Sequence, residues 1–125
     1  GPIECVWSGS KIASRSQIEI DHAIPYSLWF TNDLWNLLPA HRSVNNKKRD
    51  KLPTRRVVEA RHKKITDYWE LLWNAEPAMF GNQARRLAGT TFNDFGVDAR
   101  NQLFDSFKNS IEFTAANRAV ERWEP

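Results

Sequence analysis

Cysteine is nearly absent from this sequence, in which Cys5 is the only one among 125 residues. A lone cysteine excludes a disulfide within the chain and any zinc ribbon built from cysteine pairs. No apolar run approaches the roughly 20 residues that a membrane span needs, and the sequence opens without the pattern of a signal peptide. We therefore expect a protein of a reducing compartment that has no membrane partner, with Cys5 buried by packing.

Bulky aromatic residues, by contrast, are plentiful. Six Trp, seven Phe and two Tyr supply enough apolar surface for a core, and a chain of this length suits one domain. Gly1-Pro2 is the pair that a common tag-removing protease leaves behind, so we expect these two residues to be a cloning remnant. The rest of the chain is then expected to be one domain taken from a larger parent protein.

The modest net charge of +3 hides a strong segregation of charge. Residues 42–64 contain ten Lys or Arg and two acids, a net charge of +8, whereas the rest of the chain carries −5. Such segregation offers one positive face to a polyanion. A solvated basic helix is the alternative explanation.

The first fifty residues contain short strand and turn signals. "IECVW" is an apolar run closed by Ser8-Gly9, and "QIEIDH" alternates polar and apolar residues. These segments, residues 3–7 and 17–22, predict a pair of antiparallel strands. Residues 23–42 look irregular, and Ser43 is the expected cap of a short helix.

Beyond Pro53 the apolar positions recur with a period of 3.6 residues. Residues 55–74 predict a long amphipathic helix with Thr54 as its N-cap. A second helix is expected over residues 77–89, followed by the linker "TTFNDFG" and a last helix from Val97. The sequence therefore predicts an α+β chain with a mainly helical C-terminal region.

Asp21 and His22 stand side by side at the end of a predicted strand. Asp21 offers a carboxylate oxygen, and Asn45, at the start of the short helix, offers an amide oxygen. Oxygen ligands suit Mg²⁺ or Mn²⁺ better than Zn²⁺. Since strand neighbours point to opposite faces, we expect Asp21 to bind a metal while His22 takes a proton from water. This division of roles favours hydrolysis of a phosphodiester bond.

Three motifs in this region resemble those of the HNH nuclease family, which has a ββα-metal fold. "IDHAIP" resembles the first motif, "NDLWNLLP" the second and "VNNKKRDKLP" the third. The separations of 14 residues from His22 to Asn36 and 9 from Asn36 to Asn45 are those of the HNN variant, as in the HNH domain of CRISPR effector nucleases. The resemblance implies a core of two antiparallel strands and a short helix over residues 3–54, followed by a helical extension over residues 55–125.

The family pattern implies a role for each matched residue of this sequence. Asp21 and Asn45 are the expected metal ligands, and His22 is the expected general base. Asn36 is expected to brace the loop that aims His22, and Lys48 to lie near the scissile phosphate. Because the third motif lacks further histidines, Mg²⁺ is the expected ion, with Mn²⁺ or another divalent ion as a substitute.

Some positions have competing interpretations. Asn46 is an alternative ligand, although the Asn-x-x-Lys spacing to Lys48 favours Asn45. His41 is another candidate ligand, but a loop position in contact with solvent or phosphate is the simpler explanation for it. His62 falls on the basic face of the long helix and is not expected to take part in catalysis.

Cations around the expected metal site are the expected contacts to a DNA backbone, and such contacts carry no base information. They are Arg42, Lys47, Lys48, Arg49, Lys51, Arg55 and Arg56. We therefore predict a DNA endonuclease of weak sequence preference, in which one active centre cuts one strand.

The resemblance also implies a parent that is a restriction, antiphage-defence or CRISPR effector protein of the prokaryotic cytoplasm or nucleoid, with other domains or subunits as partners. Two alternatives stay open: a nucleic-acid-binding module that does not cut, and a nuclease for RNA or structured DNA. The helical extension is either structural or a docking surface, and exposed tryptophans would indicate the second role. A further hypothesis is that the extension covers the metal site and inhibits it until a partner moves the extension away.

Overall fold

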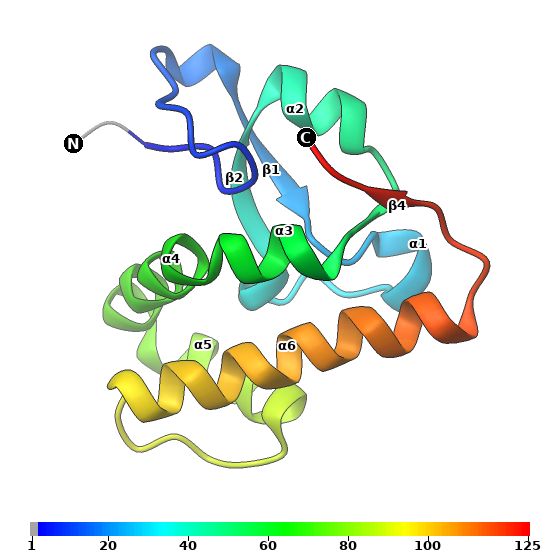
Figure 1. Ribbon diagram of the computed structural model, residues 1–125. Helices are drawn as coiled ribbons and strands as arrows, with labels where there is room; N and C mark the ends of the chain where they lie inside the picture. Colours follow the sequence, from blue (N-terminus) through cyan, green and yellow to red (C-terminus); the bar gives the residue numbers. More distant parts are fainter. Residues whose placement is uncertain (1–2) are drawn as a thin grey trace.

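A two-stranded antiparallel sheet with a short helix beside it forms the first part of the fold (Figure 1). The computed structural model describes residues 3–125, so Gly1 and Pro2, the expected cloning remnant, lie outside the described residues. Strand β1 (Ile18–His22) pairs with β2 (Leu37–His41), and α2 (Arg42–Lys48) follows β2 directly. The predicted α+β class, with a ββα core and a helical extension, is confirmed.

The connection from β1 to β2 contains two short helical elements. These are α1 (Tyr26–Trp29) and the 3-10 turn η2 (Leu34–Asn36), and a further 3-10 turn, η1 (Arg15–Gln17), precedes β1. The register places Ile18 opposite His41 and His22 opposite Leu37. The strands therefore end where the connecting segment begins, and His22 is the last residue of β1.

The partner of β1 differs from the sequence prediction. Residues 3–7 were expected to be the second strand, but they form a turn with one isolated bridge, from Glu4 to Lys11. The true partner, β2, lies in the segment that looked irregular because of Pro25, Asn32-Asp33 and Pro39. A proline lacks an N–H but keeps its carbonyl, and Pro39 uses that carbonyl to accept a bond from Val6 N at 2.9 Å.

The four helices after Pro53 follow the predicted pattern closely. The expected helix over residues 55–74 is divided at Arg61 into α3 (Arg55–Ala60) and α4 (His62–Ala75), and Thr54 caps α3 as predicted. The other two are α5 (Pro77–Ala88), which Gly89 ends in the left-handed conformation, and α6 (Val97–Asn117). Among residues 3–125, no helix has both the length and the apolar character to cross a membrane.

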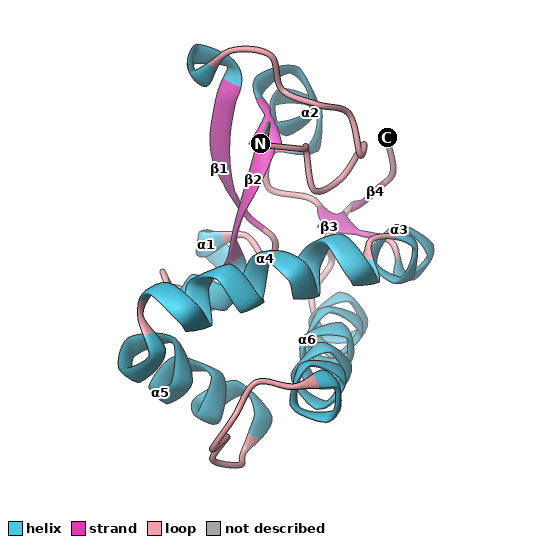
Figure 2. Cartoon of the chain, turned by 90° about the vertical axis from the view of Figure 1, so that its left-hand side faces the viewer, coloured by secondary structure: helices cyan, strands magenta, loops and turns pink. Residues whose placement is uncertain are grey.

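The end of the chain returns to the ββα part of the molecule. There β4 (Arg122–Trp123) pairs in parallel with β3 (Leu52–Pro53), which follows α2. Figure 2 shows the sheet and α2 in the upper part of the molecule and α4, α5 and α6 in the lower part. The extension therefore packs on the ββα unit from below and also adds a strand beside it.

One apolar core joins the two parts. Trp7, Trp35 and Trp69 are among its largest fully buried side chains. Trp69 of α4 donates its indole N–H to the carbonyl of Trp35 at 3.0 Å, and the rings of Trp7 and Trp123 meet edge to face. All six tryptophans are buried or half-buried. Buried and half-buried tryptophans support the structural role of the extension rather than a tryptophan-lined docking surface.

Candidate active site

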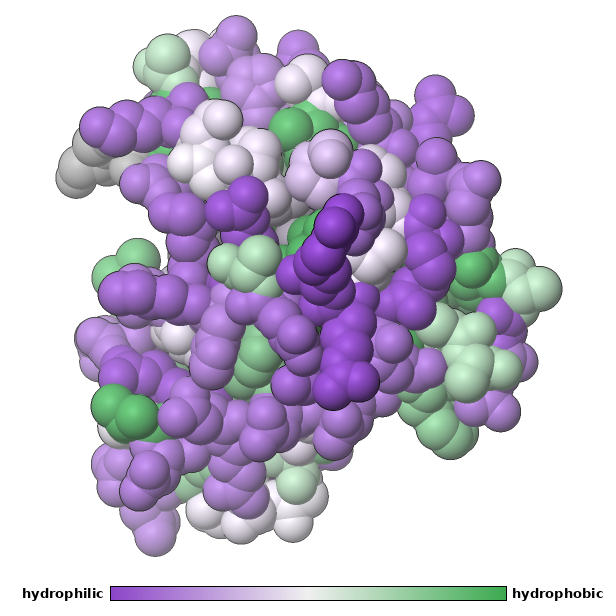
Figure 3. All heavy atoms as spheres, viewed as in Figure 1, coloured by the Kyte–Doolittle hydropathy of each residue, from purple (hydrophilic) through white to green (hydrophobic). Residues whose placement is uncertain are grey.

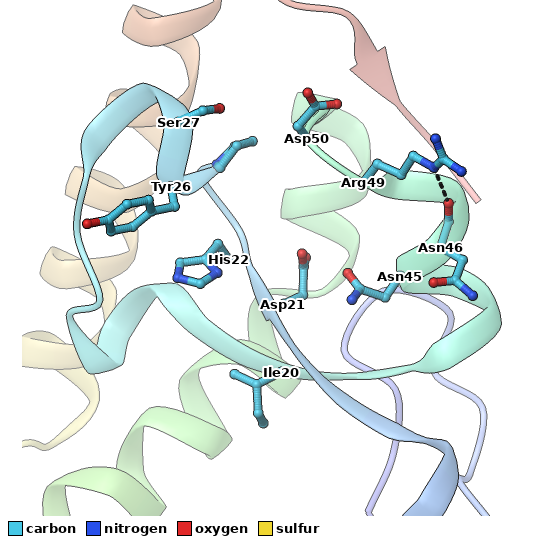
Figure 4. A pocket seen from close by; sticks show the side chains of 10 residues that line it. Ile20, Asp21, His22, Tyr26, Ser27, Asn45, Asn46, Arg49 and Asp50 are labelled. Carbon is cyan, nitrogen blue, oxygen red and sulfur yellow. Dashed lines mark hydrogen bonds between the residues drawn. The ribbon is translucent and has the colours of Figure 1, made fainter.

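An open pocket of about 430 Å³ lies at the end of β1, between α1 and α2 (Figure 4). Its walls come from β1, from the segment that begins α1, and from α2 with the turn that follows. The lining residues are Ile20, Asp21, His22, Pro25, Tyr26, Ser27, Asn45, Asn46, Arg49 and Asp50. The structure thus brings Asp21, His22 and Asn45 together, as the motif spacing predicted.

Asp21 lies at the floor of this pocket, where its side chain is only 4% exposed. Its Oδ2 atom accepts a hydrogen bond from Trp7 Nε1 at 2.7 Å and pairs with Lys48 Nζ at 3.0 Å. Oδ1 has no hydrogen-bond partner among residues 3–125. Two donors therefore fix the carboxylate by one oxygen and leave the other available to the pocket.

Lys48 lies elsewhere than the sequence analysis expected. We predicted that it lies near the scissile phosphate and contacts the DNA backbone, but its side chain is fully buried. Nζ donates to the carbonyl of His22 at 3.0 Å, pairs with Asp21 and lies 5.6 Å from the centre of the Trp7 ring. An ammonium held this way cannot reach DNA from its present position, and it instead fixes Asp21 and the end of β1 from beneath.

The burial of Asp21 and Lys48 perturbs both groups. Desolvation raises the pKa of the Asp21 carboxyl and lowers the pKa of the Lys48 ammonium, while their mutual attraction opposes both shifts. Desolvation is the largest cause at Asp21, so Lys48 offsets the cost of burying the carboxylate charge only in part. A divalent cation bound at Oδ1 would favour the charged form further.

His22 lines the pocket next to Asp21, although the two residues are neighbours on one strand. Its Nε2 atom lies 2.7 Å from Oδ1 of Asn32, and its ring meets that of Tyr26 edge to face. With Nε2–H donating to the amide oxygen, Nδ1 carries the lone pair that can accept a proton. Sequence analysis missed Asn32, because an exposed loop asparagine gives no signal of its own.

Asn36 is fully buried behind the loop that follows β1. Its Oδ1 accepts from Ile24 N at 2.7 Å, and its Nδ2 donates to Ile24 O at 2.8 Å. The Asn36 carbonyl also accepts from Ala23 N at 2.9 Å. These three bonds hold the backbone immediately after His22, which is the arrangement that the predicted bracing role requires.

Asn45 faces Asp21 across the pocket from the first turns of α2 (Figure 4). Its Nδ2 donates to Glu19 Oε1 at 3.0 Å. A carboxylate accepts and cannot donate, so this bond fixes which end of the amide is nitrogen and leaves Oδ1 as the free acceptor. Asn46, the alternative ligand, also lines the pocket but is more exposed than Asn45, and its main-chain carbonyl accepts from Arg49 Nε at 3.2 Å.

The two free oxygens, Oδ1 of Asp21 and Oδ1 of Asn45, fit a hard divalent cation. Mg²⁺ binds through one or two protein oxygens and completes its shell with water and substrate phosphate. Among residues 3–125, no group of three or more His, Cys, Asp or Glu side chains is placed to hold a metal. The donors that the pocket presents are therefore one carboxylate, one amide and the solvent.

The two other histidines have structural partners away from the pocket. His41 is the N-cap of α2, because its Nδ1 accepts from Ser43 N at 3.0 Å. The cap thus comes two residues before the expected Ser43. His62 stacks on Phe104 and lies 3.1 Å from Asn101 Oδ1. Neither histidine is a lining residue of the pocket.

The predicted DNA-contacting cations differ in how they are partnered. Four of them pair with acids: Arg42 with Glu19, Lys51 with Glu121, Arg55 with Glu59 and Arg56 with Glu124. In the part of the chain that the structure describes, the exposed Lys47 and Arg49 have no acid within 4.0 Å. Arg49 also lines the pocket. Of the predicted DNA-contacting cations, the two that lack an acidic partner in the described residues therefore both lie at the end of α2 beside the pocket.

A comparison with protein families gives a match over the segment that contains this pocket. The family model described as HNH endonuclease matches residues 5–54, which span β1, β2, α2 and β3. A search of curated proteins found no match to the chain.

Proposed function

Residues 5–54 belong to the HNH endonuclease family, and from this premise we propose that the chain hydrolyses phosphodiester bonds of DNA with a divalent metal ion, cutting one strand at a time. The observation that carries the proposal is the meeting of Asp21, His22 and Asn45 in one pocket. A module that only bound DNA would need the positive surface but would not need this combination. The position of each side chain supports a separate step.

His22 is the proposed general base. With Nε2 engaged by Asn32, the Nδ1 atom takes the proton from a water that attacks the phosphorus. Asn36 keeps the following loop in place, so the imidazole is held at one position rather than sampling several. A positioned base contributes typically about 10² to 10⁴ in rate.

Asp21 and Asn45 are the proposed metal ligands, each through its Oδ1 atom, and Mg²⁺ is the proposed ion. When bound, a divalent ion there would stabilise the charge that develops on the phosphorane and on the leaving oxygen. Lys48 keeps the Asp21 carboxylate oriented through Oδ2. It is thus a positioning residue in this proposal, in place of the phosphate contact that the sequence suggested.

Lys47 and Arg49 are the proposed main contacts to the DNA backbone. Both are exposed on α2 or directly after it, and Arg49 lines the pocket. Arg42, Lys51, Arg55 and Arg56 are proposed as weaker contacts, since each already has an acidic partner. Exposed ion pairs are worth little, so these cations can exchange an acid for a phosphate.

The resemblance of the motifs to the HNN variant supports a wider role as the nuclease module of a larger protein. A restriction, antiphage-defence or CRISPR effector parent is proposed on that ground. Other domains or subunits of that parent would then supply the choice of target.

Cleavage of supercoiled plasmid tests the function directly. The chain is incubated with Mg²⁺, with Mn²⁺ or with EDTA, and the conversion to nicked circles is measured for the wild type and for His22→Ala. We expect metal-dependent nicking that falls by about 10² or more in the variant. His62→Ala is the matched control, because it removes a histidine outside the pocket, and it should nick like the wild type.

Four outcomes would contradict all or part of the proposal. Nicking that persists in His22→Ala would show that His22 is not the general base. Nicking that continues in EDTA would show that the reaction needs no metal ion. Salt-sensitive DNA binding by the wild type without any cutting would instead favour the binding module. RNA cleaved in preference to DNA would keep the chemistry and change the substrate.

A further inference from the structure

A line of aromatic rings leads from His22 out of the pocket. The centroids of His22 and Tyr26 lie 5.9 Å apart, and those of Tyr26 and Phe30 lie 5.7 Å apart, with both pairs meeting edge to face. Tyr26 is 47% exposed and Phe30 is 73% exposed. Tyr26 is therefore presented to solvent directly beside the proposed general base, and the more exposed Phe30 lies one ring further out.

The backbone at Phe30 makes this exposure unusual. Phe30 ends α1 in the left-handed conformation, with φ 51° and ψ 39°, and its N–H donates to Tyr26 O at 2.7 Å. Glycine or asparagine fits this conformation with less strain than a residue with a bulky side chain. Packing of the phenyl ring does not explain the residue either, because the ring is largely outside the core.

The third aromatic residue of the segment does the anchoring. Trp29 donates its indole N–H to Thr114 Oγ1 at 2.9 Å, which ties α1 to α6, and its ring meets Trp35 of the core edge to face. With Trp29 turned inward, Tyr26 and Phe30 are held outward on a fixed support. Figure 3 shows apolar surface, drawn green, gathered at the right-hand side, where Figure 1 places α1 and the end of α6.

We propose that Phe30, with Tyr26 packed against it edge to face, forms a stacking platform for an unpaired nucleobase near the scissile phosphate, so that the preferred substrate contains single-stranded DNA. The proposal rests on the proposed function, since it places the base beside the bond that the pocket would cut. Aromatic side chains bind single strands because every base has a π-face to offer. In an intact duplex that face is covered by the neighbouring bases, and the platform would have no partner.

Charge and position favour a nucleobase over an apolar protein segment. Tyr26 lines the same pocket as Arg49, so the platform is continuous with the positive end of α2. A backbone phosphate held by Arg49 and a base held by Tyr26 and Phe30 are parts of one nucleotide strand. Single-strand sites combine these two elements, a positive track and aromatic side chains.

The first arm of the test measures binding without cutting. His22→Ala protein is titrated into a single-stranded oligonucleotide that carries the fluorescent base 2-aminopurine, whose emission falls when the base stacks. We expect quenching. In the same background, Phe30→Gly should weaken binding by at least about fivefold and abolish the quenching. Phe30→Gly suits the positive φ, so it should fold at least as well as its parent. Phe30→Trp should keep the quenching.

The second arm measures cutting by proteins that retain His22. We expect a single-stranded oligonucleotide to be cleaved faster than the same sequence in a duplex, and Phe30→Gly to remove that preference. Leu71→Ala is the matched control, because Leu71 is an exposed apolar residue on α4 and does not line the pocket. It should leave both rates unchanged.

The two arms separate a failure of the platform from a failure of the enzyme. Equal cleavage of both substrates, unaffected by Phe30→Gly, would overturn the platform and leave the nuclease in place. Quenching that depends on Phe30, without cleavage of either substrate, would keep the platform and overturn the proposed function. A dimer in sedimentation that Phe30→Gly abolishes, without quenching, would assign the patch to a second copy of the chain and overturn the platform.

Discussion

The ββα part and the helical part of this molecule are stabilised in different ways. The longest regular element in residues 3–54 is α2, with seven residues, whereas α4, α5 and α6 contain 14, 12 and 21 residues. The first part fixes its side chains with hydrogen bonds and one buried ion pair, at Asn36, Asp21 and Lys48. The second part presents long apolar faces. The difference shows that short elements can hold the candidate site when longer ones extend the shared core.

Contacts between the parts make each depend on the other. Trp35 of the first part meets Phe107 of α6 edge to face, and Arg61 Nε donates to the carbonyl of Trp7 at 2.7 Å. Trp7 in turn donates to Asp21 at the floor of the pocket. A path of direct contacts therefore joins the helical part to the proposed metal ligand. Removing residues 77–125 would take away core residues rather than uncover a finished nuclease.

The largest effect on the free energy of unfolding is expected at Phe107, in the helical part. The ring is fully buried between Trp35 and Trp69, so Phe107→Ala should lower the free energy of unfolding by about 3 to 5 kcal/mol. Phe113→Ala is the control on the same helix, because Phe113 is 69% exposed, and it should change little. Urea denaturation followed by tryptophan fluorescence measures both. Two separate transitions, in place of one, would show that the two parts fold independently.

A somewhat smaller loss is expected at Lys48, in the ββα part. Lys48→Met leaves the Asp21 carboxylate buried without its cation, and breaking a buried pair costs about 3 kcal/mol or more. Adding Asp21→Asn to Lys48→Met should restore most of the stability, because no buried charge then lacks a partner. Urea denaturation of both variants measures the coupling. A single variant as stable as the wild type would show that the pair does not hold this part together.

The smallest effect concerns the ion pair that joins Glu124, near the end of the chain, to Arg56 of α3. Hydrogen bonds from Arg56 and Thr54 lower the pKa of the Glu124 carboxyl, so its charged form is favoured in the folded state. This contribution to stability is present above the ordinary pKa of a glutamate and is lost as the pH falls through the lowered value.

The variant Glu124→Gln should therefore be slightly less stable than the wild type at neutral pH and equal to it in strong acid. Thermal unfolding across that pH range measures the difference. DNA binding should become slightly tighter in the same variant, because Arg56 is released. A stability difference that grew as the pH fell would contradict the assignment.

Local patterns in the sequence were sufficient for the helices and for the family motifs. Helix caps and apolar periodicity depend on residues a few positions apart, so Thr54 and Gly89 could be assigned from their neighbours. The spacing of His22, Asn36 and Asn45 likewise marked a family motif, which the HNH endonuclease model over residues 5–54 confirms. The roles of those three side chains stay predictions until the variants are measured.

Only the tertiary structure decided which strands pair and which cations are free. Pairing of β1 with β2 rather than with residues 3–7 depends on contacts between distant segments, and Pro39 hid the second strand from a local pattern. Lys48 reads as a surface cation in a basic run, yet burial beside Asp21 makes it a structural partner of the site. Charge in a sequence is counted along the chain, whereas its effect depends on burial and on partners that folding brings within a few ångströms.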